Sequence, residues 1–225
     1  MSKLVWDATG ERLYETGVKM GVLYVQDKGA YPKGVAWNGL TSVTESPSGA
    51  EATPLYADDI KYLNLMSTEE FGASIEAYMY PDEFAECDGS AALTAGVYIG
   101  QQPRKTFGLA VKTLVGNDED MNKHGYKIHI VYGALASVSD KNYSTVNDSP
   151  EVDPFSWEFT TTPVAIGIDG FEPSSYICIN SLDFADAAGK PKLKDLEDAL
   201  YGSTSGDAYL PTPAKVFELL GYAAQ

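Results

Sequence analysis

Apolar and polar residues alternate in short runs along most of the chain, and Gly, Pro, Asn and Asp separate the runs. Alternation with a period of two is typical of β-strands with one buried face. The pattern predicts strands over residues 17–26, 35–45, 69–80, 107–115, 126–132, 155–162 and 175–182. We therefore expect a mainly β (α+β) protein.

The run at 69–80 has the clearest alternation of apolar and polar positions. One predicted face carries Phe71, Ala73, Ile75, Ala77 and Met79, and the other carries Glu70, Ser74, Glu76, Tyr78 and Tyr80. The run at 155–162 places Glu158 among the polar positions between Phe155, Trp157 and Phe159. By contrast, residues 107–115 are apolar on both faces apart from Lys112, which predicts a strand buried on both sides.

The dipeptide Asn38-Gly39 interrupts the run at 35–45. Asn-Gly is a strong signal for a hairpin turn. The arm before it is short, however, and it starts just after Pro32. We therefore favour one continuous strand with a bulge at Gly39, with a hairpin turn as the alternative.

Helical periodicity is confined to a few segments. Residues 82–87 predict one or two turns, residues 191–201 an amphipathic helix that stops at Gly202, and residues 213–220 a short terminal helix. We expect a single domain over 1–225, with a β core to about residue 182 and a helical region over 191–225. Residues 46–59, 116–125 and 138–153 are predicted to be long loops, which are usually functional or mobile.

The composition limits the partners that this chain can have. Of 225 residues, 44% are hydrophobic, so a sizeable core can form. There are 16 Lys and Arg against 32 Asp and Glu, and the net charge of -16 argues against binding nucleic acid through its phosphates. Cys87 and Cys178 are the only cysteines, and we expect free thiols in a reducing cytoplasm. No secretory signal or run of about 20 apolar residues is visible, so a membrane partner is not expected.

No motif predicts catalysis or a bound cofactor. His124 and His129 are five residues apart, so on one strand they point to opposite faces and cannot jointly hold a metal ion. Residues 117–120 lack the spacing of a calcium loop. The chain has no nucleophile elbow and no Gly-rich phosphate loop. We therefore expect no catalytic, cofactor or metal site, and we do not expect the protein to be an enzyme.

Several segments, in one order, resemble the major tail (tail-tube) proteins of long-tailed bacteriophages and prophages of Gram-positive hosts. The resemblance is densest in LVWDATGERLYETGV at 4–18, GVAWNGLTSVTESPSGAEATPLYADDIKYL at 34–63, and EEFGASIEAYMYPDEFAECDGS at 69–90. The resemblance continues at 96–109, 124–151 and 155–164. Together these segments cover most of the chain.

The resemblance implies a β-sandwich or half-barrel with a flanking helix and long loops. Six subunits would form a ring, rings would stack into a hollow tube, and strands from all subunits would join into one barrel that lines the lumen. The protein would be made in the bacterial cytoplasm and reside in the virion tail. Its partners would be copies of itself and the tape-measure, tail-terminator and distal tail or baseplate proteins, with viral DNA passing through without specific binding.

Two groups of residues then become candidates for function. Glu70, Glu76 and Glu158 are expected to line the lumen, where acidic side chains repel DNA and let it slide. The loop over residues 46–62 is expected to be an assembly arm that contacts a neighbouring subunit. Its apolar anchors would be Leu55, Tyr56 and Ile60, and Asp58 and Asp59 would keep it soluble.

The aromatic content leaves a second interpretation open. The chain has 15 Tyr, and Tyr-rich surfaces suit protein interfaces or the stacking of sugars. A carbohydrate-binding β-sandwich or a tail-decorating adhesin is therefore the alternative to a tube subunit.

Overall fold

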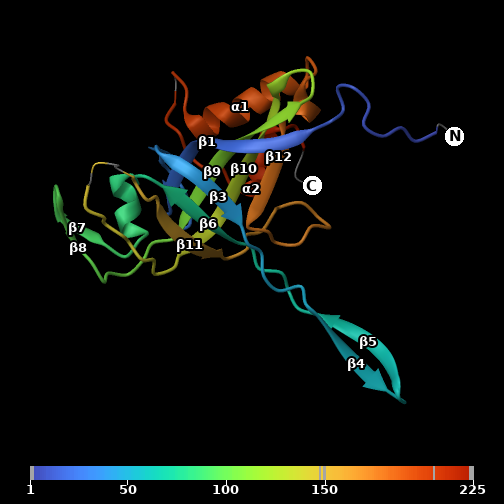
Figure 1. The fold of residues 1–225 in the computed structure, drawn as a ribbon, viewed down its shortest axis with the longest axis horizontal. Helices are drawn as coiled ribbons and strands as arrows, with labels where there is room; N and C mark the ends of the chain where they lie inside the picture. Colours follow the sequence, from blue (N-terminus) through green and yellow to red (C-terminus); the bar gives the residue numbers. More distant parts are fainter. Residues whose placement is uncertain (1–2, 147, 149–150, 205, 223–225) are drawn as a thin grey trace.

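An open, curled antiparallel sheet of eight strands dominates the computed structural model, which describes residues 3–146, 148, 151–204 and 206–222 (Figure 1). Its order is β2 (Gly34–Trp37), β1 (Tyr14–Val25), β9 (Phe107–Asn117), β10 (Met121–Ala136), β11 (Phe155–Thr161), β6 (Gly72–Ala77) and β3 (Leu40–Glu45). The eighth strand, β12 (Tyr176–Asn180), pairs with β10. The expected mainly β class is confirmed.

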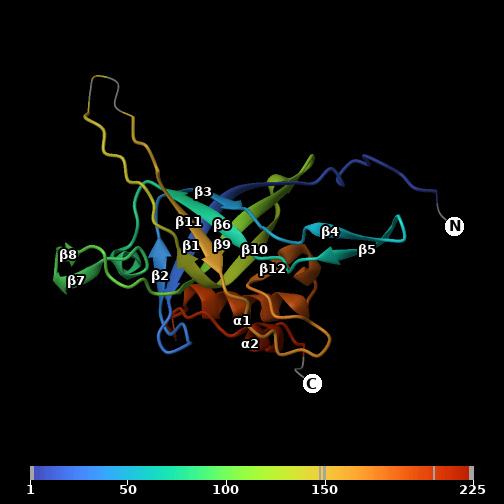
Figure 2. The same cartoon turned by 90° about the horizontal axis from the view of Figure 1, so that it is seen from below.

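Two apolar layers lie on opposite faces of this sheet. Inside the curl, side chains such as Trp37, Ile75, Leu109 and Trp157 form one buried cluster. The short 3₁₀ helix η1 (Asp82–Glu86) adds Phe84 to it, with the ring centroids of Phe84 and Trp37 4.6 Å apart. The second cluster lies between the outer face and the two helices (Figure 2).

Strand β9 is covered on both faces, as its apolar sequence predicts. Leu109 and Val111 belong to the cluster inside the curl, whereas Ala110 belongs to the cluster under the helices. The sequence of β10 alternates in the same way, because Ile128 and Ile130 face the helices and Val131 faces the curl. These two strands form the wall that separates the two layers.

The helices form where the apolar stripes predict them. Helix α1 (Gly189–Tyr201) buries Leu193, Leu196, Ala199 and Leu200, and it ends at Gly202, whose φ of 80° suits glycine. Helix α2 (Pro213–Leu219) starts after Thr212, whose side chain accepts a hydrogen bond from the Lys215 amide. Both helices contribute to the same buried cluster as β1, β9 and β10. No helix among the described residues is long and apolar enough to cross a bilayer.

The chain does not run as one strand through Asn38-Gly39, so that prediction is wrong. Strand β2 ends at Trp37 and pairs with β1, whereas β3 starts at Leu40 and pairs with β6. The two halves do not pair with each other, so a hairpin is not formed either. Gly39, with a φ of 80°, lets the chain pass from one end strand of the curled sheet to the other.

Two of the three predicted loops are wrong. Residues 46–59 lead into a hairpin of β4 (Ala52–Ala57) and β5 (Ile60–Met66), and residues 116–125 form the ends of β9 and β10 with a tight turn between them. Over 138–153 the described residues form no helix or strand; residues 147, 149 and 150 lie outside the described part. A second small hairpin, of β7 (Ala91–Thr94) and β8 (Val97–Ile99), was not predicted.

Candidate functional site

The hairpin of β4 and β5, here called the arm, projects from the body as a separate two-stranded sheet (Figure 1). Its register pairs Leu55 with Leu63 and Thr53 with Leu65. Because directly opposed residues share a face, these side chains form one apolar face. The segment over residues 46–62, predicted to be a loop, is thus part of a hairpin that extends to Met66.

Every residue of the arm is exposed. The large apolar side chains expose between 39% and 70% of their surface: Leu55, Tyr56, Ile60, Tyr62, Leu63, Leu65 and Met66. An isolated two-stranded hairpin is at best marginally stable in water, and contiguous exposed apolar surface marks interaction sites. The arm therefore has the properties of a segment that another protein surface covers.

The predicted arm residues fall into two groups in space. Leu55, Tyr56 and Ile60 lie on the paired strands. Asp58 and Asp59 form the turn between the strands, with φ angles of 50° and 61°. Positive φ at both central residues is the geometry of a type I′ hairpin turn, which matches the twist of the strands. The two carboxylates thus lie at the tip, where they are exposed to water.

A narrow neck, residues 46–51 and 67–70, joins the arm to the sheet (Figure 1). The Ser48 amide donates to the Glu70 carbonyl at 2.9 Å, and the Glu70 amide donates back at 2.8 Å. Gly49 has a φ of 84°, and a Cβ there would lie 2.2 Å from the Thr68 carbonyl oxygen. Only glycine fits this crossing of the two chains.

The outward side chains of β3, β6 and β11 form a surface that we call the polar wall. The register places Ser42 opposite Glu76, Ser74 opposite Glu158, and Ser156 opposite Glu76. Glu76 accepts a hydrogen bond of 2.8 Å from the Ser42 hydroxyl. None of the three strands contains Lys or Arg. Glu76 and Glu158 thus lie together on a surface of small hydroxyl side chains, as the alternation predicts.

Glu70 lies just before the first residue of β6, where it forms a bridge with Ser48. This bridge continues the register that pairs Ser42 with Glu76, so Glu70 is in phase with Glu76, at the root of the arm. The expected grouping of these two carboxylates on one face is compatible with this pairing. The alternation ends early on the other side: Met79 is 61% exposed, and Tyr80 packs against Trp157 with ring centroids 5.4 Å apart.

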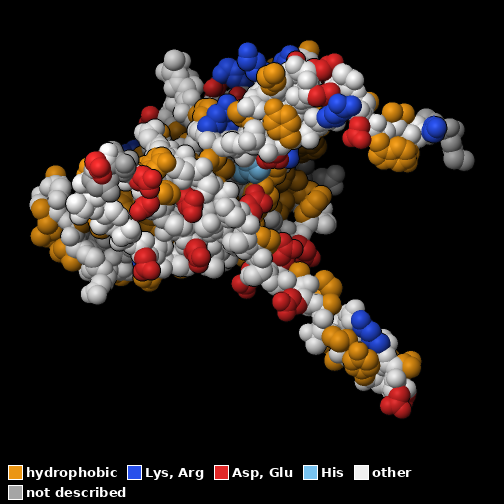
Figure 3. Space-filling model, viewed as in Figure 1, with side chains coloured by type: hydrophobic (Ala, Val, Ile, Leu, Met, Phe, Trp, Pro, Cys, Tyr) orange, Lys and Arg blue, Asp and Glu red, His pale blue; other side chains and the backbone are white. Residues whose placement is uncertain are grey.

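Charges are unevenly distributed over the surface. In the view of Figure 3, Lys and Arg gather over the side of the molecule with α1 and the start of β1, whereas Asp and Glu are spread over the body below and at the base of the arm. The three strands of the polar wall, β3, β6 and β11, contain no Lys or Arg. A polyanion would be repelled there and would find no cationic cluster to hold it.

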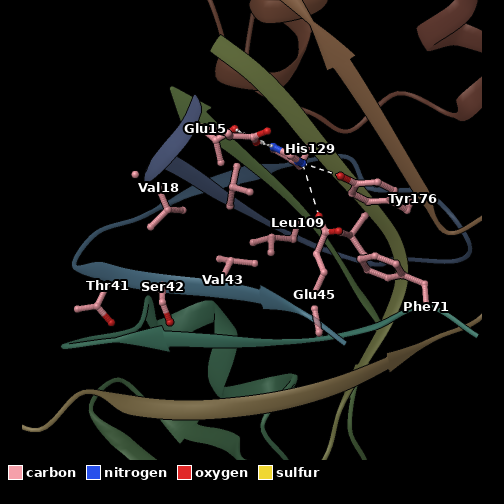
Figure 4. A pocket seen from close by; sticks show the side chains of 15 residues that line it. Glu15, Val18, Thr41, Ser42, Val43, Glu45, Phe71, Leu109, His129 and Tyr176 are labelled. Atoms are coloured by element: carbon pink, nitrogen blue, oxygen red, sulfur yellow. Dashed lines mark hydrogen bonds and ion pairs between the residues drawn. The ribbon is translucent and has the colours of Figure 1, made fainter. Parts of the chain in front are cut away.

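A pocket of about 340 Å³ opens between β1 and β3, where the curled sheet is not closed (Figure 4). Its interior is apolar: Val18, Val43, Leu109, Val111 and Val131 line it. Along the pocket, the pairing of β1 with β9 has two register shifts, between Thr16 and Lys19 and between Lys19 and Val22. Only the later part of β1, from Gly21 to Tyr24, is covered by β2.

Polar groups gather at one end of this pocket (Figure 4). His129 Nδ1 lies 2.6 Å from the Tyr176 hydroxyl and 3.6 Å from Glu45 Oε1. His129 Nε2 lies 3.2 Å from Glu15 Oε1, which also accepts a hydrogen bond of 2.6 Å from the Thr113 hydroxyl. The cluster thus places two carboxylates, those of Glu15 and Glu45, at one end of the pocket.

Two pKa shifts follow from this cluster. Burial raises the pKa of Glu15, but hydrogen bonds from Lys127 and Thr113 and the charge of Lys127 outweigh burial, so the net pKa lies below its usual range. Burial raises the pKa of the Tyr176 phenol strongly, and Cys178 and Glu45 raise it further. Glu15 is therefore a stable negative charge at neutral pH, and Tyr176 is a neutral donor.

Sequence reasoning did not find this pocket. The two histidines have different surroundings: His124 Nδ1 contacts Asp120 in the β9–β10 turn at 3.1 Å, whereas His129 faces the pocket. Nothing in the local pattern says that β1 and β3, the partners across the gap, come together. Glu15 lies before the predicted strand 17–26, so the alternation does not indicate where its side chain points.

The sequence matches no family model and no curated protein.

Proposed function

We propose that this chain is a self-assembling structural subunit: a tail-tube protein of a long-tailed bacteriophage, which forms stacked, hexameric rings around a channel for DNA. The arm carries this proposal. It presents apolar side chains on paired strands that its own chain leaves uncovered. Such a surface is stable in water only when a partner covers it, and in a homopolymer that partner is the next subunit.

The tail-tube fold itself is part of the proposal. A curled open sheet with helices on one face is compatible with it. The outward face of β3, β6 and β11 has no helix cover in the described residues, and its exposed residues are polar. This combination suits a wall that faces a water-filled lumen, while the helices cover another part of the outer face, over β1, β9 and β10.

The polar wall gives the lumen its electrostatic role. Double-stranded DNA carries about one negative charge per 1.7 Å of helix axis, so clustered Lys or Arg in the wall would retard it. Glu76 and Glu158 have the opposite effect, since they repel the phosphates from the wall. In this proposal the tube conducts DNA and does not bind it.

Removing the arm tests assembly. The Ser67 amide donates to the Glu51 carbonyl at 3.3 Å, so the two chains are already adjacent at the root of the hairpin. Replacing residues 52–66 with Asn-Gly closes the chain there with a short turn. We expect a folded monomer with unchanged thermal stability that forms no rings or tubes, measured by size-exclusion chromatography with light scattering.

A matched control keeps the arm and changes only its tip. The double variant Asp58→Asn, Asp59→Gly retains the type I′ turn and all apolar side chains. We expect it to assemble as the unaltered chain does. Tubes of normal length from the chain without residues 52–66 would contradict the role of the arm.

Charge reversal tests the lumen. The double variant Glu76→Lys, Glu158→Lys places two cations on the polar wall, and we expect tails that assemble but release DNA slowly. Glu218→Lys is the matched control, because Glu218 is exposed on helix α2 and does not belong to β3, β6 or β11. Normal infectivity of the double variant would refute the lumen assignment. A carbohydrate-binding module or an adhesin would instead remain a monomer that retains sugar on a glycan column.

A further inference from the structure

A second exposed apolar segment precedes the sheet. Leu4, Val5 and Trp6 expose 71%, 75% and 74% of their surface, and they lie outside any helix or strand. Figures 1 and 2 both show this part of the chain extending away from the body. In an extended segment alternate side chains point the same way, so Leu4 and Trp6 form one apolar side and Val5 points to the other.

The base of this segment is fixed on its own subunit. The Gly10 amide donates to Asp118 Oδ1 at 3.0 Å, and the Asn117 side-chain amide donates to the Gly10 carbonyl at 3.1 Å. Arg12 also lies 4.0 Å from Asp118. These contacts attach residues 10–12 to the β9–β10 turn, and they direct residues 3–6 away from the pocket of the same chain.

The pocket between β1 and β3 has the complementary properties. Its interior is apolar, and its volume of about 340 Å³ lies at the lower end of the range for pockets that bury a small-molecule ligand. Glu15 and Glu45 lie at its polar end, with side chains 35% and 46% exposed. An apolar segment next to a cation therefore fits the pocket in both shape and charge, and Lys3 directly precedes Leu4.

We propose that Leu4 and Trp6 of one copy of this chain occupy the pocket between β1 and β3 of a second copy, with Lys3 near the acidic end. The inference deepens the proposed self-assembly and rests on it for the neighbouring copy. The contact is separate from the arm, because its donor is residues 3–6 and its acceptor is the gap in the sheet.

The arm is another exposed apolar segment that could enter this pocket, and it fits less well. It is two strands wide, and its tip carries Asp58 and Asp59, which Glu15 and Glu45 would repel. The segment at 3–6 is a single extended chain. Trp is also the side chain that contributes most often to hot spots in protein interfaces.

A peptide-binding experiment tests the contact without requiring rings. The receptor is the full-length chain with Leu4→Ser and Trp6→Ser, which leaves the pocket free because it cannot dock its own segment. The probe is a fluorescent peptide of residues 1–13, and its anisotropy reports binding. We expect saturable binding that weakens by at least about tenfold when the peptide carries Trp6→Ser.

Matched variants locate the site. The peptide with Val5→Ser should bind nearly as well as the unaltered peptide, because Val5 points away from the pocket. The peptide with Lys3→Glu should bind more weakly, most clearly at low salt. In the receptor, Thr41→Arg at the exposed mouth and Val18→Trp inside the pocket should each abolish binding, with thermal melting of Thr41→Arg unchanged as proof of folding.

The outcomes separate this inference from the proposed function. No binding, or binding that neither Thr41→Arg nor Val18→Trp changes, overturns the inference, and tubes formed by the same chain would leave the proposed function intact. Binding with these sensitivities supports the inference. If the intact chain then forms no rings or tubes, the proposed tube function fails and the contact between copies stands.

Discussion

Strands β5 and β9 have a similar distribution of apolar residues and opposite surroundings. Each carries apolar side chains on both faces, and each contains one lysine, Lys61 in β5 and Lys112 in β9. Strand β9 is almost wholly buried, with the helices on one face and the interior of the curl on the other. Strand β5 is exposed along its whole length.

The comparison shows what a strand with two apolar faces requires. Such a strand needs a cover on each face. The chain supplies both covers for β9 and neither for β5, and in the proposed tube the covers for β5 come from another subunit. The difference cannot be read from either strand alone, and it follows only from the position of each strand in the sheet.

The largest effect is expected from truncating equivalent leucines in the two strands. Leu109 in β9 is 1% exposed, and Leu109→Ala should lower the free energy of unfolding by about 3 kcal/mol because it leaves a cavity. Leu63→Ala in β5 should change it by less than about 0.5 kcal/mol but weaken assembly. Urea unfolding of the dilute monomers measures both. An equal loss from Leu63→Ala would show that the arm packs on its own chain.

The next largest effect on the free energy of unfolding is expected from substitutions that test the surroundings of the two lysines. The Lys112 amine lies 2.5 Å from Glu197 Oε1 and 4.0 Å from the centroid of the Tyr126 ring, in a place where its side chain is 9% exposed. Glu197→Ala would leave this cation buried without its carboxylate, at a cost of about 1–3 kcal/mol. Lys61→Ala, on the exposed arm, should leave urea unfolding unchanged. A similar loss in both variants would remove the contrast between the strands.

A smaller effect is expected from a substitution in the neck that joins the arm to the sheet. Gly49→Ala combines a left-handed φ with a contact of 2.2 Å to the Thr68 carbonyl, so it should distort the neck and reduce assembly measured by light scattering. Gly96→Ala is the control, because Gly96 has a φ of 79° and nothing within 4 Å of its Cβ position. Both share the backbone strain, and only Gly49→Ala adds the clash. Equal assembly of the two variants would show that the geometry of the neck is unimportant.

The smallest effect is expected from pH. The pKa of Glu15 is lower in the folded protein than its ordinary value of 4.5, so its contribution to stability is complete above pH 4.5 and is lost as the pH falls through the folded pKa. Glu15→Gln should reduce stability at pH 7 and flatten the decline below pH 4.5. Urea unfolding between pH 7 and pH 3 measures this, with Glu51→Gln on the exposed neck as the control. An unchanged acid limb in Glu15→Gln would contradict the lowered pKa.

Local patterns predicted the elements whose burial follows from their own sequence. The stripe of α1 and the alternation around Trp157 and Glu158 are complete within one segment, so they could be read directly. The hairpin of β4 and β5 was missed, because Ser, Pro and Gly at 46–49 are typical of a loop and the strands that follow have no alternation of buried and exposed positions.

The parts that could not be predicted depend on contacts between distant segments. Asn38-Gly39 is a hairpin signal, yet its two flanking strands pair with β1 and β6 because the sheet curls. The pocket forms between β1, which carries Glu15, and β3, which carries Glu45, for the same reason, since these strands lie far apart in the strand order. Residue spacing carries no information about such closure.

Negative-stain electron microscopy of the purified, concentrated chain tests the central claim most directly. If the arm and the polar wall belong to a tube subunit, the images should show rings and hollow tubes, and the variant that lacks residues 52–66 should show neither. A chain that remains monomeric at high concentration, with its arm intact, would contradict the account.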